Sequence, residues 1–155
     1  MERIIVIGND NKFIVNVEAA IYKEGKFLIV KRSEEEDHAA GELALVGGKV
    51  EIETNDVIDN ILEKTVKREI EEEVSIQVDD EMQYLESKFF VSETMNGVVD
   101  IVFLCKYKSG TARCNDLEEV AEVYWLSADE ILNNEKTPYY LKDSIRKAMS
   151  CLNKK

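Results

Sequence analysis

An amphipathic segment in the middle of the chain, over residues 56–74, constrains the fold most. Aliphatic side chains recur there every four positions, at Leu62, Val66, Ile70 and Val74. This spacing predicts one helix with a single apolar stripe. Thr54, Asn55 or Asp56 is expected to cap its start. Because such a stripe is stable only when another element covers it, the rest of the chain must supply a partner surface.

Apolar and β-branched runs on both sides of this helix predict the partner surface. Runs 13–22 and 27–30 flank the turn signal Lys23-Glu24-Gly25-Lys26 and predict a β-hairpin. Further strands are predicted over 83–91, 98–107 and 120–126.

The last part of the chain carries two helix signals. Ser127-Ala128-Asp129-Glu130 is a capping-box pattern, and Pro138 fits the first turn of a last helix that ends near Leu152. Strands therefore both precede and follow the central helix. This order predicts a mixed α/β (α+β) fold, built as one domain over residues 1–155.

Composition narrows the function classes. The formal net charge of −12 argues against nucleic acid or an anionic membrane as partner. No apolar run approaches the length of a membrane span, and Met1–Asp10 lacks the pattern of a signal peptide. The three cysteines form no CxxC pair, so we expect a reducing, cytoplasmic location.

The C-terminal end of the central helix carries the most informative residues. At 100° per residue, Glu69, Glu72 and Glu73 share one face, next to the apolar stripe. Like charges at this spacing repel by about 0.2–0.5 kcal/mol per pair, and Arg68 can offset part of this by reaching Glu71 and Glu72. Two interpretations stay open from spacing alone. The face is either a solvated acidic surface or a site for Mg²⁺ or Mn²⁺, which prefer hard oxygen ligands.

The context of this helix resembles a known signature. Gly47-Gly48-Lys49-Val50-Glu51, followed by the segment from Arg68 to Ile76, is similar to the Nudix hydrolase signature. That signature has a Gly, a Glu six residues later, and then Arg-Glu-apolar-any-Glu-Glu-any-Gly-apolar. Residues 18–32 resemble the opening hairpin of the family, and residues 119–131, which include Trp125, resemble its closing strand and helix. The resemblance implies a mixed sheet sandwiched between helices.

The resemblance also implies an activity. Family members hydrolyse a pyrophosphate bond in a nucleoside diphosphate linked to another group, such as a nucleoside triphosphate, an ADP-ribose-like compound or a nucleotide sugar. Carried over to this chain, the Mg²⁺ (or Mn²⁺) ligands are the carboxylates of Glu69, Glu72 and Glu73 and the carbonyl of Gly47. The expected partner is thus a small-molecule nucleotide, and a homodimer is common in the family.

The same resemblance suggests further roles. The catalytic candidates are Glu72, Glu119 and Arg68. Glu119 is favoured as the general base over its neighbours Glu118 and Glu122, which are otherwise exposed acids beside a strand. Arg68 is expected to orient a carboxylate, or else to act only as an ion-pair partner within the helix.

Two cations complete the candidate site. Arg32 and Lys49 are candidates for contacting substrate phosphates, and otherwise are solvated surface cations.

Three departures from the signature leave alternatives open. The spacing before the helix is longer, with an insertion over 52–59; Asn60 stands where the first helical Glu is expected; and Ser75 stands where the Gly is expected. Glu51 or Glu53 can replace the missing Glu only if the loop folds back. These departures motivate a second hypothesis, a catalytically weak or inactive nucleotide sensor. A third takes the acids as the surface of an interaction module.

Overall fold

The computed structural model describes residues 12–36 and 39–154. The expectation about Met1–Asp10 therefore lies outside the described residues. The strands are β1 (Ile14–Lys23), β2 (Lys26–Arg32), β3 (Leu43–Ala44), β4 (Val46–Lys49), β5 (Gln77–Val91), β6 (Gly97–Ser109) and β7 (Val120–Ser127). The helices are α1 (Ile61–Val74), α2 (Ala128–Asn133) and α3 (Tyr139–Asn153).

Strand β1 organises the sheet, because it is paired along both edges. One edge runs parallel to β6, from the pair Ile14–Val98 to the pair Tyr22–Lys106. The other edge pairs with β2 only next to the turn, and its first half pairs with β4 instead. Strands β3 and β7 extend the sheet from β2, and β5 extends it from β6. The short strand β4 is thereby held beside the centre of the sheet.

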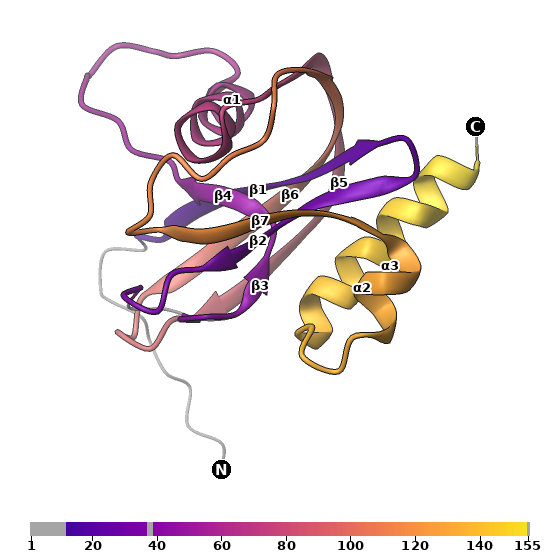
Figure 1. The fold of residues 1–155 in the computed structure, drawn as a ribbon. Coiled ribbons are helices and arrows are strands. Elements are labelled where there is room, and N and C mark those ends of the chain that lie inside the picture. Colours follow the sequence, from indigo (N-terminus) through magenta and orange to yellow (C-terminus); the bar gives the residue numbers. More distant parts are fainter. Residues whose placement is uncertain (1–11, 37–38, 155) are drawn as a thin grey trace.

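Apolar side chains project from both faces of this sheet. Val17, Ala19 and Ile21 of β1 join Val66 and Ile70 of α1 in one buried cluster. On the other face, Ala20, Phe27 and Ile29 join Leu141 and Ile145 of α3 in a second cluster. Figure 1 shows the sheet between α1 on one side and α2 with α3 on the other. This confirms the predicted mixed α/β fold with a sheet between helices.

The predicted start of the central helix is wrong. Helix α1 begins at Ile61, not at Asp56, and Asn60 before it has a left-handed backbone (φ 54°) that cannot continue a helix. The residue Val57 is 91% exposed. The predicted cap residues Thr54, Asn55 and Asp56 therefore do not cap α1. Instead, Thr54 Oγ1 accepts a hydrogen bond from the Asp56 N–H, at 3.1 Å. Ile58 lies four residues before Leu62 and continues the apolar repeat, so periodicity alone does not reveal that the helix begins only after Asn60.

Other local predictions hold, with longer strands than expected. The turn between β1 and β2 uses left-handed Glu24 and Gly25 (φ 48° and 78°), and Ser127 and Glu130 form the predicted reciprocal capping box. Pro138 is the N-cap residue of α3, directly before its first turn. Strand β5 begins at Gln77 instead of residue 83, because its pairing with β6 continues across an irregular stretch between Val78 and Met82.

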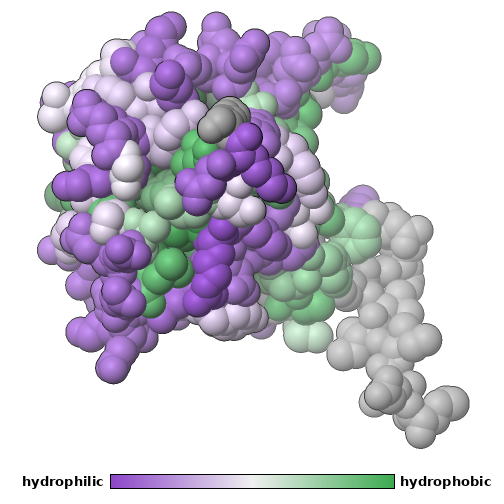
Figure 2. Space-filling model, turned by 90° about the vertical axis from the view of Figure 1, so that its right-hand side faces the viewer, coloured by the Kyte–Doolittle hydropathy of each residue, from purple (hydrophilic) through white to green (hydrophobic). Residues whose placement is uncertain are grey.

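Hydrophilic residues predominate on the side shown in Figure 2, and green, hydrophobic areas lie between them. None of the described helices is long and apolar enough to cross a membrane.

The packing of α1 generates a stability prediction. Ile70 is 1% exposed, whereas Val57 lies in the loop before the helix and is 91% exposed. We expect Ile70→Ala to lower the free energy of unfolding by about 2–5 kcal/mol, through lost burial and a cavity. Val57→Ala is the matched control and should change it by less than about 0.5 kcal/mol. Urea denaturation monitored by circular dichroism measures both, and equal effects would contradict the assigned packing.

Candidate metal-binding and catalytic site

Two of the predicted carboxylates come from one face of α1. Glu69 and Glu73 are four residues apart, so their side chains are neighbours on the same face of the helix, about one turn from each other. The apolar stripe of α1 holds this face against β4 and β1. As a result the Glu73 residue is only 7% exposed, and the Glu69 side chain is 13% exposed. Both acids are thus largely removed from water before any partner is considered.

The two glycines of β4 make room for this arrangement. A Cβ atom on Gly48 would lie 2.6 Å from Glu69 Oε2, so a side chain at this position would displace the Glu69 carboxylate from the place it occupies. On the opposite face of the strand, a Cβ atom on Gly47 would lie 3.0 Å from Glu18 Cγ. The Gly47 backbone N–H also donates a hydrogen bond to the Glu73 carboxylate. Gly48 therefore leaves room for the Glu69 carboxylate beside β4, and Gly47 leaves room for β1 on the other face of the strand.

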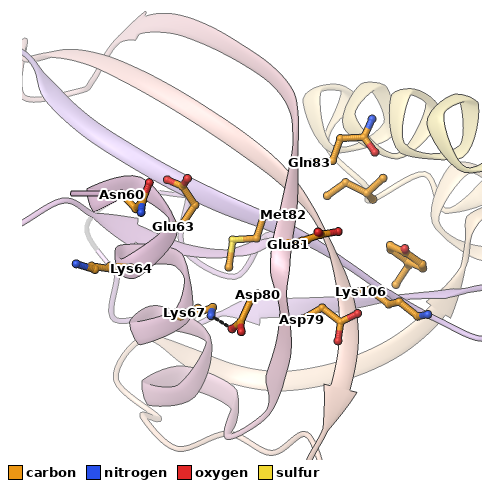
Figure 3. A pocket seen from close by; sticks show the side chains of 12 residues that line it. Asn60, Glu63, Lys64, Lys67, Asp79, Asp80, Glu81, Met82, Gln83 and Lys106 are labelled. Carbon is orange, nitrogen blue, oxygen red and sulfur yellow. Dashed lines mark hydrogen bonds and ion pairs between the residues drawn. The ribbon is translucent and has the colours of Figure 1, made fainter.

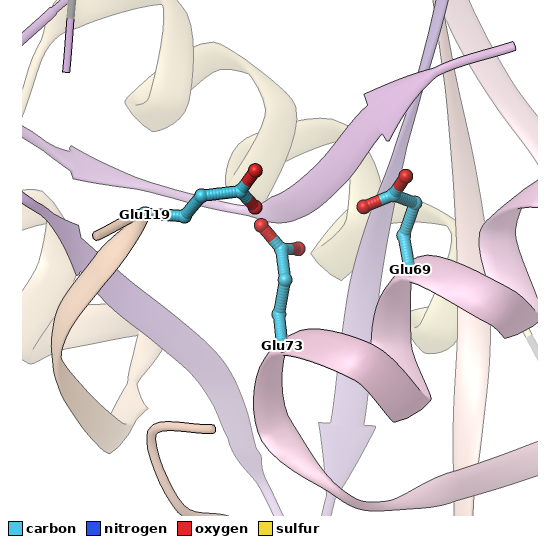
Figure 4. A group of neighbouring side chains, drawn as sticks. All are labelled: Glu69, Glu73 and Glu119. Atoms are coloured by element: carbon cyan, nitrogen blue, oxygen red, sulfur yellow. The ribbon is translucent and has the colours of Figure 1, made fainter. Parts of the chain in front are cut away.

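The third carboxylate comes from the loop before β7. Glu69, Glu73 and Glu119 each offer an oxygen within 4.8 Å of the others. Figure 4 shows Glu119 reaching from its loop toward Glu73, with Glu69 on the next turn of α1. We call these three residues the carboxylate trio. It brings together segments that lie far apart in the sequence.

Burial and like charge change the pKa values of the trio. Burial, then hydrogen bonding to Glu119 and the charges of Glu69 and Glu119, raise the pKa of Glu73 to about 9. Burial is also the main cause that raises the pKa of Glu69 to about 7, with Arg68 opposing it and Glu72, Glu119 and Glu51 adding to it. Within the part of the chain described, Glu73 Oε2 is buried and has no hydrogen-bond partner.

Such a donor set fits a divalent cation. The oxygens are hard ligands of the kind that Mg²⁺ and Mn²⁺ prefer, and a cation would satisfy the orphaned Glu73 oxygen while removing the mutual repulsion. The residues present are therefore compatible with the metal that the sequence suggested.

Arg68 contacts a carboxylate of the trio. Its Nη2 lies 3.1 Å from Glu69 Oε1, and the same nitrogen is 3.4 Å from the Lys49 carbonyl oxygen. Arg68 makes this contact instead of the expected pairing with Glu71 and Glu72. Arg68 thus ties Glu69 to the end of β4.

The remaining predicted residues are not members of the trio. Glu72 is exposed on α1 and is not one of the three clustered acids, although its charge reaches Glu69. Lys49 is exposed at the end of β4, and Arg32 at the end of β2 forms an ion pair with Glu36 at 3.5 Å.

The two other candidates for the general base, Glu118 and Glu122, are not members of the trio. Glu122 points to Lys31 and to the Tyr124 hydroxyl, at 3.7 Å and 2.5 Å. Glu118 is exposed in the loop.

The departures from the signature have visible consequences. Asn60 is the N-cap residue of α1 and lines a groove of about 1060 Å³ between α1 and β5, away from the trio. Figure 3 shows this groove, which the ion pair between Lys67 and Asp80 crosses. Glu51 is close enough for its charge to raise the pKa of Glu69.

The sequence analysis missed one pair of neighbouring acids, Glu18 and Asp100. Burial and the neighbouring Asp100 raise the pKa of Glu18, and the two carboxyl groups share a hydrogen bond. Asn16 Nδ2 donates to Asp100 Oδ1 at 2.7 Å. The available signal was a charged residue inside the apolar run of β1, between Val17 and Ala19.

Comparisons with known proteins agree with this geometry. The NUDIX domain family model matches residues 12–147. No curated protein matches the chain.

Solved structures of the same fold include two MutT proteins. The MutT protein from Methanosarcina mazei Go1 is 29% identical, with a TM-score of 0.72, over 96% of this chain and 100% of that one. The MutT NUDIX hydrolase from Burkholderia pseudomallei is 24% identical, with a TM-score of 0.71, over 88% and 98%. The NUDIX domain of Shewanella oneidensis NrtR, solved with ADP ribose, is 19% identical, with a TM-score of 0.70, over 92% and 90%.

The raised pKa values generate a prediction about stability and pH. A carboxyl group whose pKa is higher in the folded than in the unfolded state holds its proton more tightly when folded. The metal-free protein should therefore lose stability as the pH rises from about 4.5, the ordinary value, to about 9, the value of Glu73. Glu73→Gln removes this titration, so its melting temperature should fall less over that range.

The control for this test is Glu71→Gln, an exposed acid on the same helix. It removes the same charge and should follow the wild-type pH profile. Thermal melts in EDTA from pH 5 to pH 9 measure all three proteins. A Glu73→Gln profile as steep as that of the wild type would contradict the burial assigned to this acid.

Proposed function

We propose a function from the premise that the chain belongs to the Nudix hydrolase family, since the NUDIX domain model matches residues 12–147. The family and the MutT hydrolases of the same fold support a pyrophosphohydrolase. Our proposal is that this protein hydrolyses a pyrophosphate bond in a nucleoside diphosphate linked to another group, and that the reaction requires Mg²⁺ or Mn²⁺.

The observation that supports this proposal is the carboxylate trio with its buried, unpartnered Glu73 oxygen. A polyphosphate substrate carries several negative charges, and the chain itself has a net charge of −12. Without cations, such a site would repel its substrate. Divalent ions reverse the local sign of the charge.

In this proposal Glu69, Glu72, Glu73 and the Gly47 carbonyl hold the cation, and Glu119 adds a fifth oxygen donor or accepts a proton. The bound ion supplies polarisation of the phosphoryl oxygen and a lower pKa for the attacking water. Arg68 holds the Glu69 carboxylate in place through its contact at 3.1 Å. Arg32 and Lys49 bind substrate phosphates.

The proton of the attacking water needs an acceptor. We assign this role to the Glu119 carboxylate, because it is the exposed member of the trio and lies on a loop that faces solvent. Glu73 is less suited, because it is buried and a raised pKa keeps its proton in the metal-free site.

The substrate class is a small-molecule nucleotide. Neighbours of the same fold include a domain solved with ADP ribose and a protein described as a UDP-X diphosphatase. We propose that the loops 33–41 and 52–59 and helix α3 select among nucleoside triphosphates, ADP-ribose-like compounds and nucleotide sugars.

The proposal also includes a cytoplasmic location and one catalytic domain over residues 1–155.

A second candidate function is binding of a nucleotide without hydrolysis. Asn60 motivates it, because the acid expected at this point of the signature is absent and Asn60 lies by the groove instead. The two functions differ in one measurable property. A sensor binds nucleotide tightly and releases no product.

The test is turnover over a nucleotide panel with Mg²⁺ and with Mn²⁺, followed by release of phosphate or nucleoside monophosphate. We expect wild-type turnover that EDTA abolishes. Glu69→Gln, Glu72→Gln and Glu73→Gln should each lower kcat by about 100-fold or more, because each removes a cation ligand. Glu71→Gln, on the same helix, should keep wild-type activity.

The outcomes separate the hypotheses. Nucleotide binding without any product would favour the sensor. Equal activity of Glu71→Gln and Glu73→Gln would refute the assigned ligands.

A further inference from the structure

The loop between β6 and β7 is fastened to the C-terminal end of α1. The last carbonyl groups of a helix have no partner within the helix. Here the Arg113 N–H donates to Val74 O at 3.1 Å, and the Asn115 N–H donates to Glu73 O at 3.0 Å. The Asn115 side chain adds a bond from Nδ2 to Glu71 O, at 3.2 Å. The loop thus supplies the partners of Glu73 O and Val74 O, and adds a bond to Glu71 O, which also accepts the Ser75 N–H at 3.1 Å.

Ser75 takes part in this attachment with its side chain. It follows the last residue of α1 and has a left-handed backbone, with φ 61° and ψ 30°. Glycine is preferred in this conformation, so serine costs stability here. Its hydroxyl oxygen accepts hydrogen bonds from Asn115 Nδ2 and, at 3.3 Å, from Arg113 Nε. A glycine cannot make either contact.

The fastened stretch leads directly to Glu119. Asp116 O accepts hydrogen bonds from the N–H groups of Glu119 and Val120, at 3.1 Å and 2.8 Å. Asp116 Oδ1 accepts another from the Glu118 N–H at 3.1 Å. These bonds make residues 116–120 one tight turn, so the position of Asn115 fixes the position of Glu119. On the far side, the Ser33 N–H donates to Glu119 O at 2.9 Å.

We propose that Ser75, Arg113 and Asn115 form a latch that holds the β6–β7 loop on the end of α1 and so places the Glu119 carboxylate beside Glu73. The residues of the latch are positioning residues, because they act through Glu119. The inference deepens the proposed function and rests on it for its effect on turnover. It gives a reason for serine at a position where the backbone favours glycine.

The alternative is that the latch only stabilises the fold. Two substitutions at one position separate these explanations. Ser75→Gly relieves the left-handed backbone but removes the hydroxyl, and Ser75→Thr keeps the hydroxyl but adds a β-branch that the left-handed region disfavours. If the latch is only structural, activity should follow stability in both variants. If it positions Glu119, kcat should follow the presence of the hydroxyl group and not the stability.

The experiment compares melting temperature, kcat and KM for the wild type, Ser75→Gly and Ser75→Thr, well below their melting temperatures. In Ser75→Gly the relieved backbone and the two lost hydrogen bonds offset one another, so we expect a melting temperature close to that of the wild type. Its kcat should fall about tenfold with little change in KM. Ser75→Thr should melt lower and keep a kcat near that of the wild type. A Ser75→Gly enzyme with wild-type kcat, or a Ser75→Thr enzyme that loses kcat with its stability, would overturn the proposal.

Asn115 provides a second, independent variant pair. Asn115→Asp keeps the shape of the side chain but removes both amide donors, so it should lower kcat as Ser75→Gly does. Leu117→Ala changes an exposed side chain of the same loop and should leave kcat unchanged. A loss of kcat in Leu117→Ala equal to that in Asn115→Asp would contradict a specific latch.

A readout without turnover keeps this proposal separate from the proposed function. Amide hydrogen exchange of a peptide covering residues 111–119 reports directly on the attachment of the loop. We expect faster exchange in Ser75→Gly than in the wild type, although the two proteins melt at similar temperatures. Faster exchange with no wild-type turnover would support the latch and refute the hydrolase. Wild-type turnover with unchanged exchange in Ser75→Gly would support the hydrolase and refute the latch.

Discussion

The burial of like charges beside one another is the constraint on which the site depends. Three carboxylates from α1 and the β6–β7 loop lie within 4.8 Å of one another, and one of them is 7% exposed. Burial and mutual repulsion both oppose the ionised forms, which is why the pKa values of Glu69 and Glu73 are raised to about 7 and about 9. The fold holds this arrangement with interactions made elsewhere, and a divalent cation is the partner that would relieve it.

Packing on both faces of the sheet supplies that support. The apolar stripe of α1 fixes the helix over β1, and Gly48 of β4 leaves room for the Glu69 carboxylate beside the strand. The latch at the end of α1 then fixes the loop that carries Glu119. Because β1 pairs with β4 along the half of its edge that β2 leaves free, the glycines reach the centre of the sheet. The positions of the carboxylates are thus set by strand pairing and helix packing together.

Much of this could be predicted from the sequence, because the signals were local. The left-handed turn at Glu24 and Gly25, the stripe of α1 and the capping box at Ser127 each depend on a few neighbouring residues. The helix start was predicted too early because Ile58 continues the apolar repeat, whereas the left-handed backbone of Asn60 prevents the helix from beginning before Ile61. Periodicity placed Glu69, Glu72 and Glu73 on one helix face. It could not tell which of them the sheet would bury, or that Glu119 and not Glu72 would complete the cluster with Glu69 and Glu73. The paired carboxyls of Glu18 and Asp100 were missed because they depend on the parallel register of β1 and β6.

Calorimetric titration of the metal-free protein with Mn²⁺ tests the central claim most directly, because it needs neither a substrate nor an assigned reaction. The account predicts that the wild type and Glu71→Gln bind the ion with similar affinity, and that Glu73→Gln binds it at least tenfold more weakly. Absence of binding by the folded wild type, or undiminished binding by Glu73→Gln, would contradict the account.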